Sequence, residues 1–172
     1  MKKIAITFIC CMIAILAQAQ TEHLSFMGIP LNGTIDQFQA KLQSKGCRQD
    51  VQASKTGCRI FNGSFEGEDS RLLIYYNEKS KIVYRAKAII KRNTQEEIKQ
   101  LLVKFKDMLQ SKYDTKEEGD SFEGNPAYRL YIYRSNKSSF KGEIDLYYYK
   151  EIFFTYYLLS IDYIDSANKI AK

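Results

Sequence analysis

Hydrophobic residues recur at three- and four-residue steps in two segments of the chain, a spacing that predicts amphipathic helices. Both segments begin with the same polar signal, because Thr34 is followed by Gln37 and Thr94 by Glu97, the arrangement of a capping box. Gly46 ends the first segment. The apolar positions of the second segment are Ile98, Leu101, Leu102, Phe105, Met108 and Leu109. Each helix must therefore lay one apolar face on another layer of the fold.

That layer is predicted to be a β-sheet, since the segments after each helix alternate between apolar and polar residues and are rich in β-branched and aromatic side chains. The expected strands are residues 47–51, 58–65, 71–76 and 82–90 after the first helix, and residues 127–134, 141–149 and 152–163 after the second. The polar segment 114–126 is predicted as a loop. This order indicates an α+β fold with a mainly antiparallel sheet of about six to eight strands and helices on one face.

The two capping threonines are sixty residues apart, and each opens a helix that is followed by strands. This order predicts one α+β domain over residues 20–172, built from two pseudo-repeats, residues 24–91 and 92–172. The two halves share little direct identity, so the predicted repeat is one of layout.

The N-terminus carries the pattern of an export signal. Lys2 and Lys3 precede an apolar run over residues 4–17, and Ala17 and Ala19 are the small residues that a signal peptidase accepts. The run holds fourteen residues, fewer than the roughly 18 of a membrane-spanning helix. We predict that residues 1–19 are a cleaved signal peptide and that the mature protein is periplasmic or secreted, without a stable membrane anchor.

The net charge and its distribution argue against nucleic acid as a partner. The formal net charge of +6 falls to +4 without Lys2 and Lys3, and acidic residues are interspersed among the basic ones along the chain. Such a small, mixed surplus lacks the basic stripe of a nucleic-acid-binding protein, so we expect no nucleic acid as a partner.

Two cysteines remain after the signal peptide, Cys47 and Cys58, in a compartment where disulfides form. A hairpin that reverses near Gln52 and Ala53 would bring them into cross-strand register, so we predict a disulfide between them. The alternative is a pair of reduced or metal-binding thiols, but tetrahedral zinc needs four ligands and the chain has one histidine. We expect neither a metal nor a cofactor.

Residues suited to catalysis are sparse. His23 is the only histidine and lies four residues past the predicted cleavage site, so a histidine-based triad is not expected. Carboxylates cluster at residues 66–69 and 114–123 without the alternating spacing of an EF-hand loop. We assign no catalytic residue and interpret both clusters as solvated charge. An enzyme or small-ligand carrier with a pocket between the sheet and these acidic loops stays open as an alternative.

The tyrosines are unevenly distributed, because nine of the thirteen lie at or after Tyr128. Strand alternation places Leu130 and Ile132 on one face of the predicted sheet. The opposite face then carries Arg129, Tyr131, Tyr133, Tyr147 and Tyr149. Rigid amphipathic rings mixed with charges are typical of protein-recognition surfaces. The alternative is that these tyrosines only pair across a half-exposed sheet, where such residues are common.

The predicted strand 152–163 is apolar on both faces, which is typical of a strand that is central or covered twice. Either the sheet curls over itself there, or a second chain packs on it. A structural homodimer is therefore a further alternative.

The chain resembles small exported bacterial proteins of unknown function. The resemblance lies in residues 23–35, the helix that ends at residues 45–47, the segment 61–67 and the long helix that ends at residues 112–113. The layout also resembles the beta-lactamase-inhibitory-protein-like fold, in which tandem helix-plus-sheet repeats grip a partner with a concave sheet face. Outer-membrane assembly lipoproteins of the SmpA/OmlA type have a related, smaller layout, although this chain lacks their lipid-attachment cysteine. Together with the tyrosines, the resemblance favours an exported, non-catalytic binding module for a protein or an envelope polymer.

Overall fold

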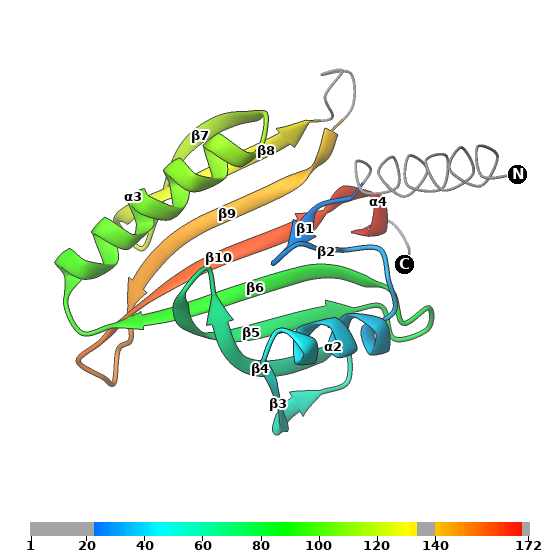
Figure 1. Ribbon diagram of the computed structural model, residues 1–172. Helices are drawn as coiled ribbons and strands as arrows, with labels where there is room; N and C mark the ends of the chain where they lie inside the picture. Colours follow the sequence, from blue (N-terminus) through cyan, green and yellow to red (C-terminus); the bar gives the residue numbers. More distant parts are fainter. Residues whose placement is uncertain (1–22, 134–139, 170–172) are drawn as a thin grey trace, which may run out of the picture.

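The computed structural model describes residues 23–133 and 140–169, so the predicted signal peptide lies outside the described residues. An eight-stranded sheet carries the helices α2 and α3 on one face, and a small β1–β2 hairpin lies between these helices (Figure 1). The elements are β1 (Ser25–Phe26), β2 (Ile29–Pro30), α2 (Ile35–Ser44), β3 (Arg48–Lys55), β4 (Cys58–Phe65), β5 (Glu68–Tyr76), β6 (Val83–Arg92), α3 (Gln95–Lys112), β7 (Thr115–Phe122), β8 (Asn125–Tyr133), β9 (Phe140–Lys150), β10 (Tyr157–Asp165) and α4 (Ser166–Lys169).

All neighbouring strands of the large sheet are antiparallel, in the order β3-β4-β5-β6-β10-β9-β8-β7. This confirms the predicted α+β fold with an antiparallel sheet. The strands β6 and β10 pair at the centre, and each half of the chain contributes a helix followed by four strands. The boundary between the predicted pseudo-repeats falls at the end of β6, but the duplication itself stays a prediction.

Both helices begin where the sequence predicts, because their capping boxes form. The Thr34 hydroxyl accepts the Gln37 backbone N–H, and the Gln37 side chain accepts the Thr34 N–H at 3.1 Å. Thr94 and Glu97 make the same reciprocal pair at the start of α3. These bonds satisfy amides that a helix cannot pair internally, and so fix the start of each helix.

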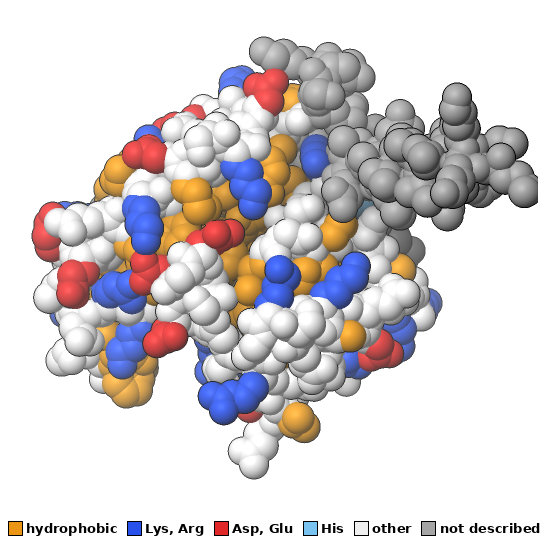
Figure 2. Space-filling model, viewed as in Figure 1, with side chains coloured by type: hydrophobic (Ala, Val, Ile, Leu, Met, Phe, Trp, Pro, Cys, Tyr) orange, Lys and Arg blue, Asp and Glu red, His pale blue; other side chains and the backbone are white. Residues whose placement is uncertain are grey.

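The hydrophobic core lies between the helices and one face of the sheet. α2 packs on β3, and α3 packs on β6, β9 and β10. Ile161 in β10 lies between Ala88 of β6 and Leu146 of β9, and all three are fully buried. The β1–β2 hairpin adds Phe26, whose ring centroid is 5.1 Å from that of Phe65. Figure 2 shows apolar side chains gathered between α3 and its neighbours, on the helix-bearing side of the molecule.

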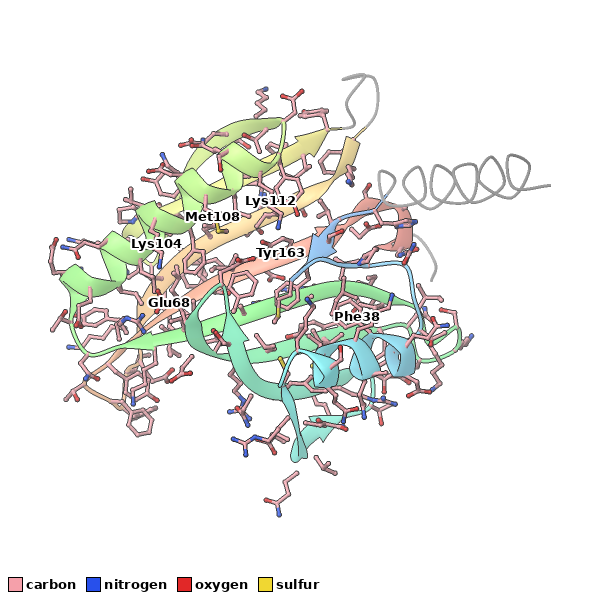
Figure 3. The ribbon with its side chains drawn as sticks, viewed as in Figure 1. Phe38, Glu68, Lys104, Met108, Lys112 and Tyr163 are labelled. Atoms are coloured by element: carbon pink, nitrogen blue, oxygen red, sulfur yellow. The ribbon has the colours of Figure 1, made fainter. Side chains whose placement is uncertain are left out.

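A charged contact ties α3 to the sheet. Glu68, the first residue of β5, accepts a hydrogen bond of 2.7 Å from Lys104 of α3 (Figure 3). The same carboxylate pairs with Arg92 of β6. The hydrogen bond from Lys104 is the main cause that lowers the pKa of Glu68, and Arg92 adds to it. One carboxylate therefore links three elements through two cations.

The segment 114–126, predicted as a loop, forms the edge strand β7 and the turn into β8. Most residues of β7 are exposed and polar or charged, so neither apolar alternation nor β-propensity marks it. The strand arises because its backbone pairs with β8 along its whole length. The prediction of a loop here was wrong because tertiary pairing overrides a weak local signal.

The last strand is shorter than predicted. β10 begins at Tyr157, and residues 151–156 form the loop between β9 and β10. β10 pairs with β6 along one edge and with β9 along the other. Its two apolar faces therefore belong to a central strand, and its edges are occupied within this chain.

The predicted disulfide between Cys47 and Cys58 is wrong, because both cysteines are free and buried. The hairpin reverses at residues 56–57, where Lys55 pairs with Cys58. Cys47 instead lies against Gly63, where an added Cβ would be 2.6 Å from the cysteine sulfur. Cys47 belongs to the core under the helices, whereas Cys58 points to the other face, since alternate residues of β4 face opposite sides.

His23 takes part in a structural contact near the end of β10. Its Nδ1 lies 3.2 Å from the Oδ1 of Asp165, a carboxylate that is fully buried. The other oxygen of Asp165 accepts the Leu24 N–H at 2.8 Å, and Oδ1 also accepts the N–H groups of Ala167 and Asn168 in α4. This carboxylate therefore joins the start of the described chain to its last helix.

Candidate functional site: the open face of the sheet

The face of the sheet opposite α2 and α3 carries the residues that the sequence singled out. In the register of β8 and β9, Arg129 pairs with Asp145 and Tyr131 with Glu143, and these positions alternate with the buried residues of both strands. The open face thus presents Arg129, Tyr131, Tyr133, Tyr147 and Tyr149, each half-buried. We call these five residues the tyrosine surface.

A first aromatic cluster forms at one end of the tyrosine surface. The Phe122 ring centroid is 4.5 Å from that of Tyr147 and 6.1 Å from that of Tyr149. Phe122 ends β7, which is separated from β9 by β8. Its ring reaches Tyr147 across β8, where the β7–β8 hairpin comes close to β9. A depression lies beside this cluster and is lined in part by Phe122 and Tyr147.

A second cluster lies at the other end of β8 and β9. The Phe140 ring centroid is 6.0 Å from that of Tyr131 and 6.2 Å from that of Tyr133. The Tyr131 hydroxyl donates a hydrogen bond of 2.8 Å to Glu118 of β7, and this bond raises the pKa of Tyr131. Phe140 is 42% exposed, so the cluster offers an accessible apolar edge beside a fixed phenol.

Arg129 and Asp145 stand between the two aromatic clusters, next to Tyr131 on the same face of β8 and next to Tyr147 on the same face of β9. Arg129 donates to both oxygens of Asp145, at 2.7 and 3.1 Å. The hydrogen bond to this carboxylate is the main cause that raises the pKa of Arg129. A bidentate pair holds the guanidinium flat and in one orientation, so it is a rigid polar element between two sets of rings.

A buried ion cluster lies beside the tyrosine surface at the centre of the sheet. Asp162 in β10 accepts bonds from Arg85 of β6, at 2.8 Å from Nε, and its side chain is only 3% exposed. Lys87 Nζ lies 3.1 Å from the same carboxylate. The bond to Asp162 raises the pKa of Arg85. Burial by itself lowers that of Lys87, but Asp162 and the Tyr147 hydroxyl outweigh it, so the net shift of the Lys87 pKa is upward.

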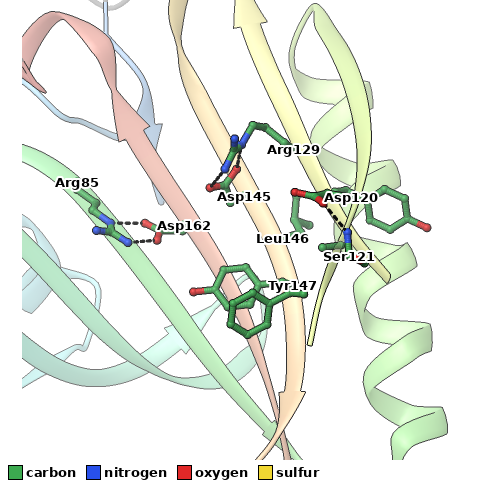
Figure 4. A pocket seen from close by; sticks show the side chains of 11 residues that line it. Arg85, Asp120, Ser121, Arg129, Asp145, Leu146, Tyr147 and Asp162 are labelled. Carbon is green, nitrogen blue, oxygen red and sulfur yellow. Dashed lines mark hydrogen bonds and ion pairs between the residues drawn. The ribbon is translucent and has the colours of Figure 1, made fainter. Parts of the chain in front are cut away.

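A pocket of about 220 Å³ opens between these groups and the β7–β8 hairpin. Figure 4 shows the Arg85–Asp162 and Arg129–Asp145 pairs on neighbouring strands, with Tyr147 and the Asp120–Ser121 part of β7 around the same space. It is small compared with the roughly 300 to 1,000 Å³ typical of ligand pockets. The site is better described as a broad surface with one shallow depression.

Two carboxylates that line this depression are engaged in ion pairs. Asp145 and Asp162 are each held by an arginine, so neither carboxylate is available as a general acid or base without breaking an ion pair. Within residues 23–133 and 140–169, no group of three His, Cys, Asp or Glu side chains is placed to hold a metal ion. The arrangement can stack on flat apolar groups and donate or accept hydrogen bonds at fixed positions.

Sequence reasoning missed several residues of this face. Phe122 was missed because β7 was not predicted as a strand, and Phe140 because it lies at the very start of β9. Ser160 and Asp162 could have been found, since they alternate with buried residues of β10 and so must face the open side. Ser160 is 1% exposed, and its hydroxyl has no hydrogen-bond partner among the described residues.

No family model, curated protein or solved structure matches the chain. The resemblance noted from the sequence therefore stays a prediction. Among the described residues, no helix is long and apolar enough to cross a membrane.

Proposed function

We propose that this protein is a non-catalytic binding module that holds a protein or an envelope polymer against the tyrosine surface. The observation that carries the proposal is the arrangement of side chains along β8 and β9. Two accessible aromatic clusters flank a rigid Arg129–Asp145 pair on the face that the described helices leave open. Aromatic rings and arginine are the residues that dominate binding energy in protein interfaces.

The rigidity of the surface supports the same proposal. All members of the tyrosine surface lie on two paired strands of the sheet, and the tyrosine rings contact neighbouring rings. Tyrosine loses little conformational entropy on binding, because it has few rotatable bonds. A partner therefore meets a surface that is already organised, and the ordering cost of association is low.

The test compares capture of partners from cell-envelope extract by two variants of the chain that lacks residues 1–19. In the first, Tyr131, Tyr133, Tyr147 and Tyr149 are changed to serine, and we expect capture to be lost while the melting temperature shifts only by a few degrees. The control is Tyr75→Ser on the same face, outside both clusters. Collapse of the first variant, or its undiminished capture, contradicts the proposal.

A second candidate function is a small-ligand carrier, favoured by the depression beside Arg85, Arg129 and Tyr147. A carrier would retain a ligand through purification, whereas the proposed module would not. Native mass spectrometry of the protein isolated from its own cells distinguishes the two. A bound small molecule that is lost on Arg129→Gln but kept after Tyr133→Ser would favour the carrier.

A further inference from the structure

The loop between β9 and β10 exposes three large apolar side chains in a row. Ile152 is 85% exposed, Phe153 87% and Phe154 56%. The loop projects past the end of the sheet (Figure 1), and Figure 2 shows an apolar area at the same lower-left end of the molecule. Single exposed apolar residues are ordinary, but three consecutive ones at a projecting tip indicate a surface that binds something.

The tip is held in shape by contacts at its base. The Phe154 N–H donates to the Glu151 carbonyl, and the Glu151 N–H donates to the Tyr156 carbonyl, both at 3.2 Å. The Phe154 ring stacks on the Tyr156 ring, with centroids 5.1 Å apart. Lys91 Nζ lies 3.9 Å from the centroid of the Tyr156 ring. The apolar side chains are therefore presented outward by an ordered turn with Lys91 at its base.

A basic groove of about 580 Å³ begins at this base and runs over the open face of β4, β5 and β6. Its cations are Arg48, Arg71 and Lys91, and its apolar floor includes Ile89 and Leu158. Asp69 is the only acidic side chain among the described residues that line it. Tyr156 belongs to both the loop and the groove, so the apolar tip and the cations form one continuous surface.

We propose that this end of the molecule docks reversibly on an anionic phospholipid bilayer. The tip enters the boundary between headgroups and acyl chains, where apolar and aromatic side chains are favoured. The groove cations then face the headgroup phosphates, which attract lysine and arginine at the membrane surface. Charge complementarity selects this occupant over an apolar protein pocket, because Lys91 lies at the base of the tip and the groove continues from it to Arg71 and Arg48. The proposal is independent of the tyrosine surface and does not need it.

The chain contains no tryptophan, so Phe153→Trp introduces a single fluorescent reporter at the tip. The experiment uses the chain without residues 1–19, whose apolar run would itself bind lipid. We expect the emission of this reporter to shift to the blue, and to be quenched by brominated acyl chains, on vesicles of phosphatidylcholine mixed with phosphatidylglycerol. The matched control is Val103→Trp on α3, also exposed, whose emission we expect to stay unshifted.

Unlabelled variants then test each half of the surface by vesicle co-sedimentation. Phe153→Ser with Phe154→Ser should weaken binding by about tenfold or more, because two buried rings are lost. Arg71→Gln with Lys91→Gln should remove the preference for the anionic vesicles. Unshifted emission of the Phe153→Trp variant on every vesicle overturns the proposal. So does a blue shift that grows with protein concentration in the absence of lipid, since the tip would then bind a second copy.

Discussion

The Tyr147 hydroxyl accepts a hydrogen bond of 2.9 Å from the Lys87 ammonium group, although the strand β10 lies between their strands. Lys87 thereby connects the tyrosine surface to the buried carboxylate of Asp162. The two halves of the chain meet in this contact, since Lys87 comes from β6 and Tyr147 from β9. The orientation of the first aromatic cluster consequently depends on an ion cluster at the centre of the sheet.

Tyr147→Phe tests this dependence. The variant keeps the ring against Phe122 but removes the acceptor for Lys87, so we expect a loss of unfolding free energy of about 1 kcal/mol. Tyr149→Phe is the matched control, because its hydroxyl has no hydrogen bond to Lys87 in the described structure, and it should cost less. Urea denaturation measures both. Equal costs for the two variants would show that the Lys87 bond contributes nothing.

Asp162→Asn should be the most damaging single change on the open face. It leaves Arg85 and Lys87 without their shared carboxylate at a position that is 3% exposed, and such an unpaired charge costs about 3 kcal/mol. Asp145→Asn is the comparison, because its partner Arg129 is 41% exposed and water can replace the lost bond. We expect that variant to cost about 1 kcal/mol in the same denaturation experiment. A reversed order would contradict the assigned burial of the ion cluster.

Acid should weaken the contact between α3 and the sheet through Glu68. Its folded-state pKa is lowered by Lys104 and Arg92, so its stabilising contribution is fully present above the ordinary glutamate pKa. The contribution is lost as the pH falls through the lowered folded-state pKa. Glu68→Gln should therefore cost about 1 kcal/mol at neutral pH and almost nothing once the wild-type carboxyl is protonated. The measurement is the difference in unfolding free energy between the two proteins across the acidic range.

Both cysteines should remain protonated, unreactive thiols in the folded protein. Burial is the main cause that raises the pKa of Cys47 and of Cys58, so each should react slowly with a thiol reagent in the native protein. After unfolding, the chain without residues 1–19 should react rapidly at both positions. A reductant should leave the melting temperature of the folded protein unchanged. If reduction changed the electrophoretic mobility of the protein, or if the unfolded chain showed no reactive thiol, the predicted disulfide would be present after all.

The sequence predicted the parts of the fold whose local signals agree with the tertiary structure. The capping boxes at Thr34 and Thr94 fixed the starts of the helices, and the alternation in β8 and β9 placed Tyr131 and Tyr147 on the correct face. Side-chain periodicity carries this information because a strand has two faces, and the described helices cover only one of them here.

Other features of the fold depend on strand pairing and turn positions that no local sequence pattern predicts. β7 is polar and becomes a strand through β8, which is why the place of Phe122 in the aromatic cluster was not predicted. The hairpin that contains Cys47 and Cys58 turns at residues 56–57 instead of near Gln52 and Ala53, so the two cysteines are not opposite each other. The apolar residues before Tyr157 were predicted as strand, although they form an exposed loop.

Site-specific photo-crosslinking tests the central claim, that the open face binds the partner. A benzoylphenylalanine in place of Tyr131 lies on the tyrosine surface, and one in place of Gln100 lies on the exposed side of α3 on the opposite face. After irradiation in cell-envelope extract, we predict a specific adduct from position 131 and none from position 100. An adduct from position 100 alone would contradict this account and place the partner on the helical side.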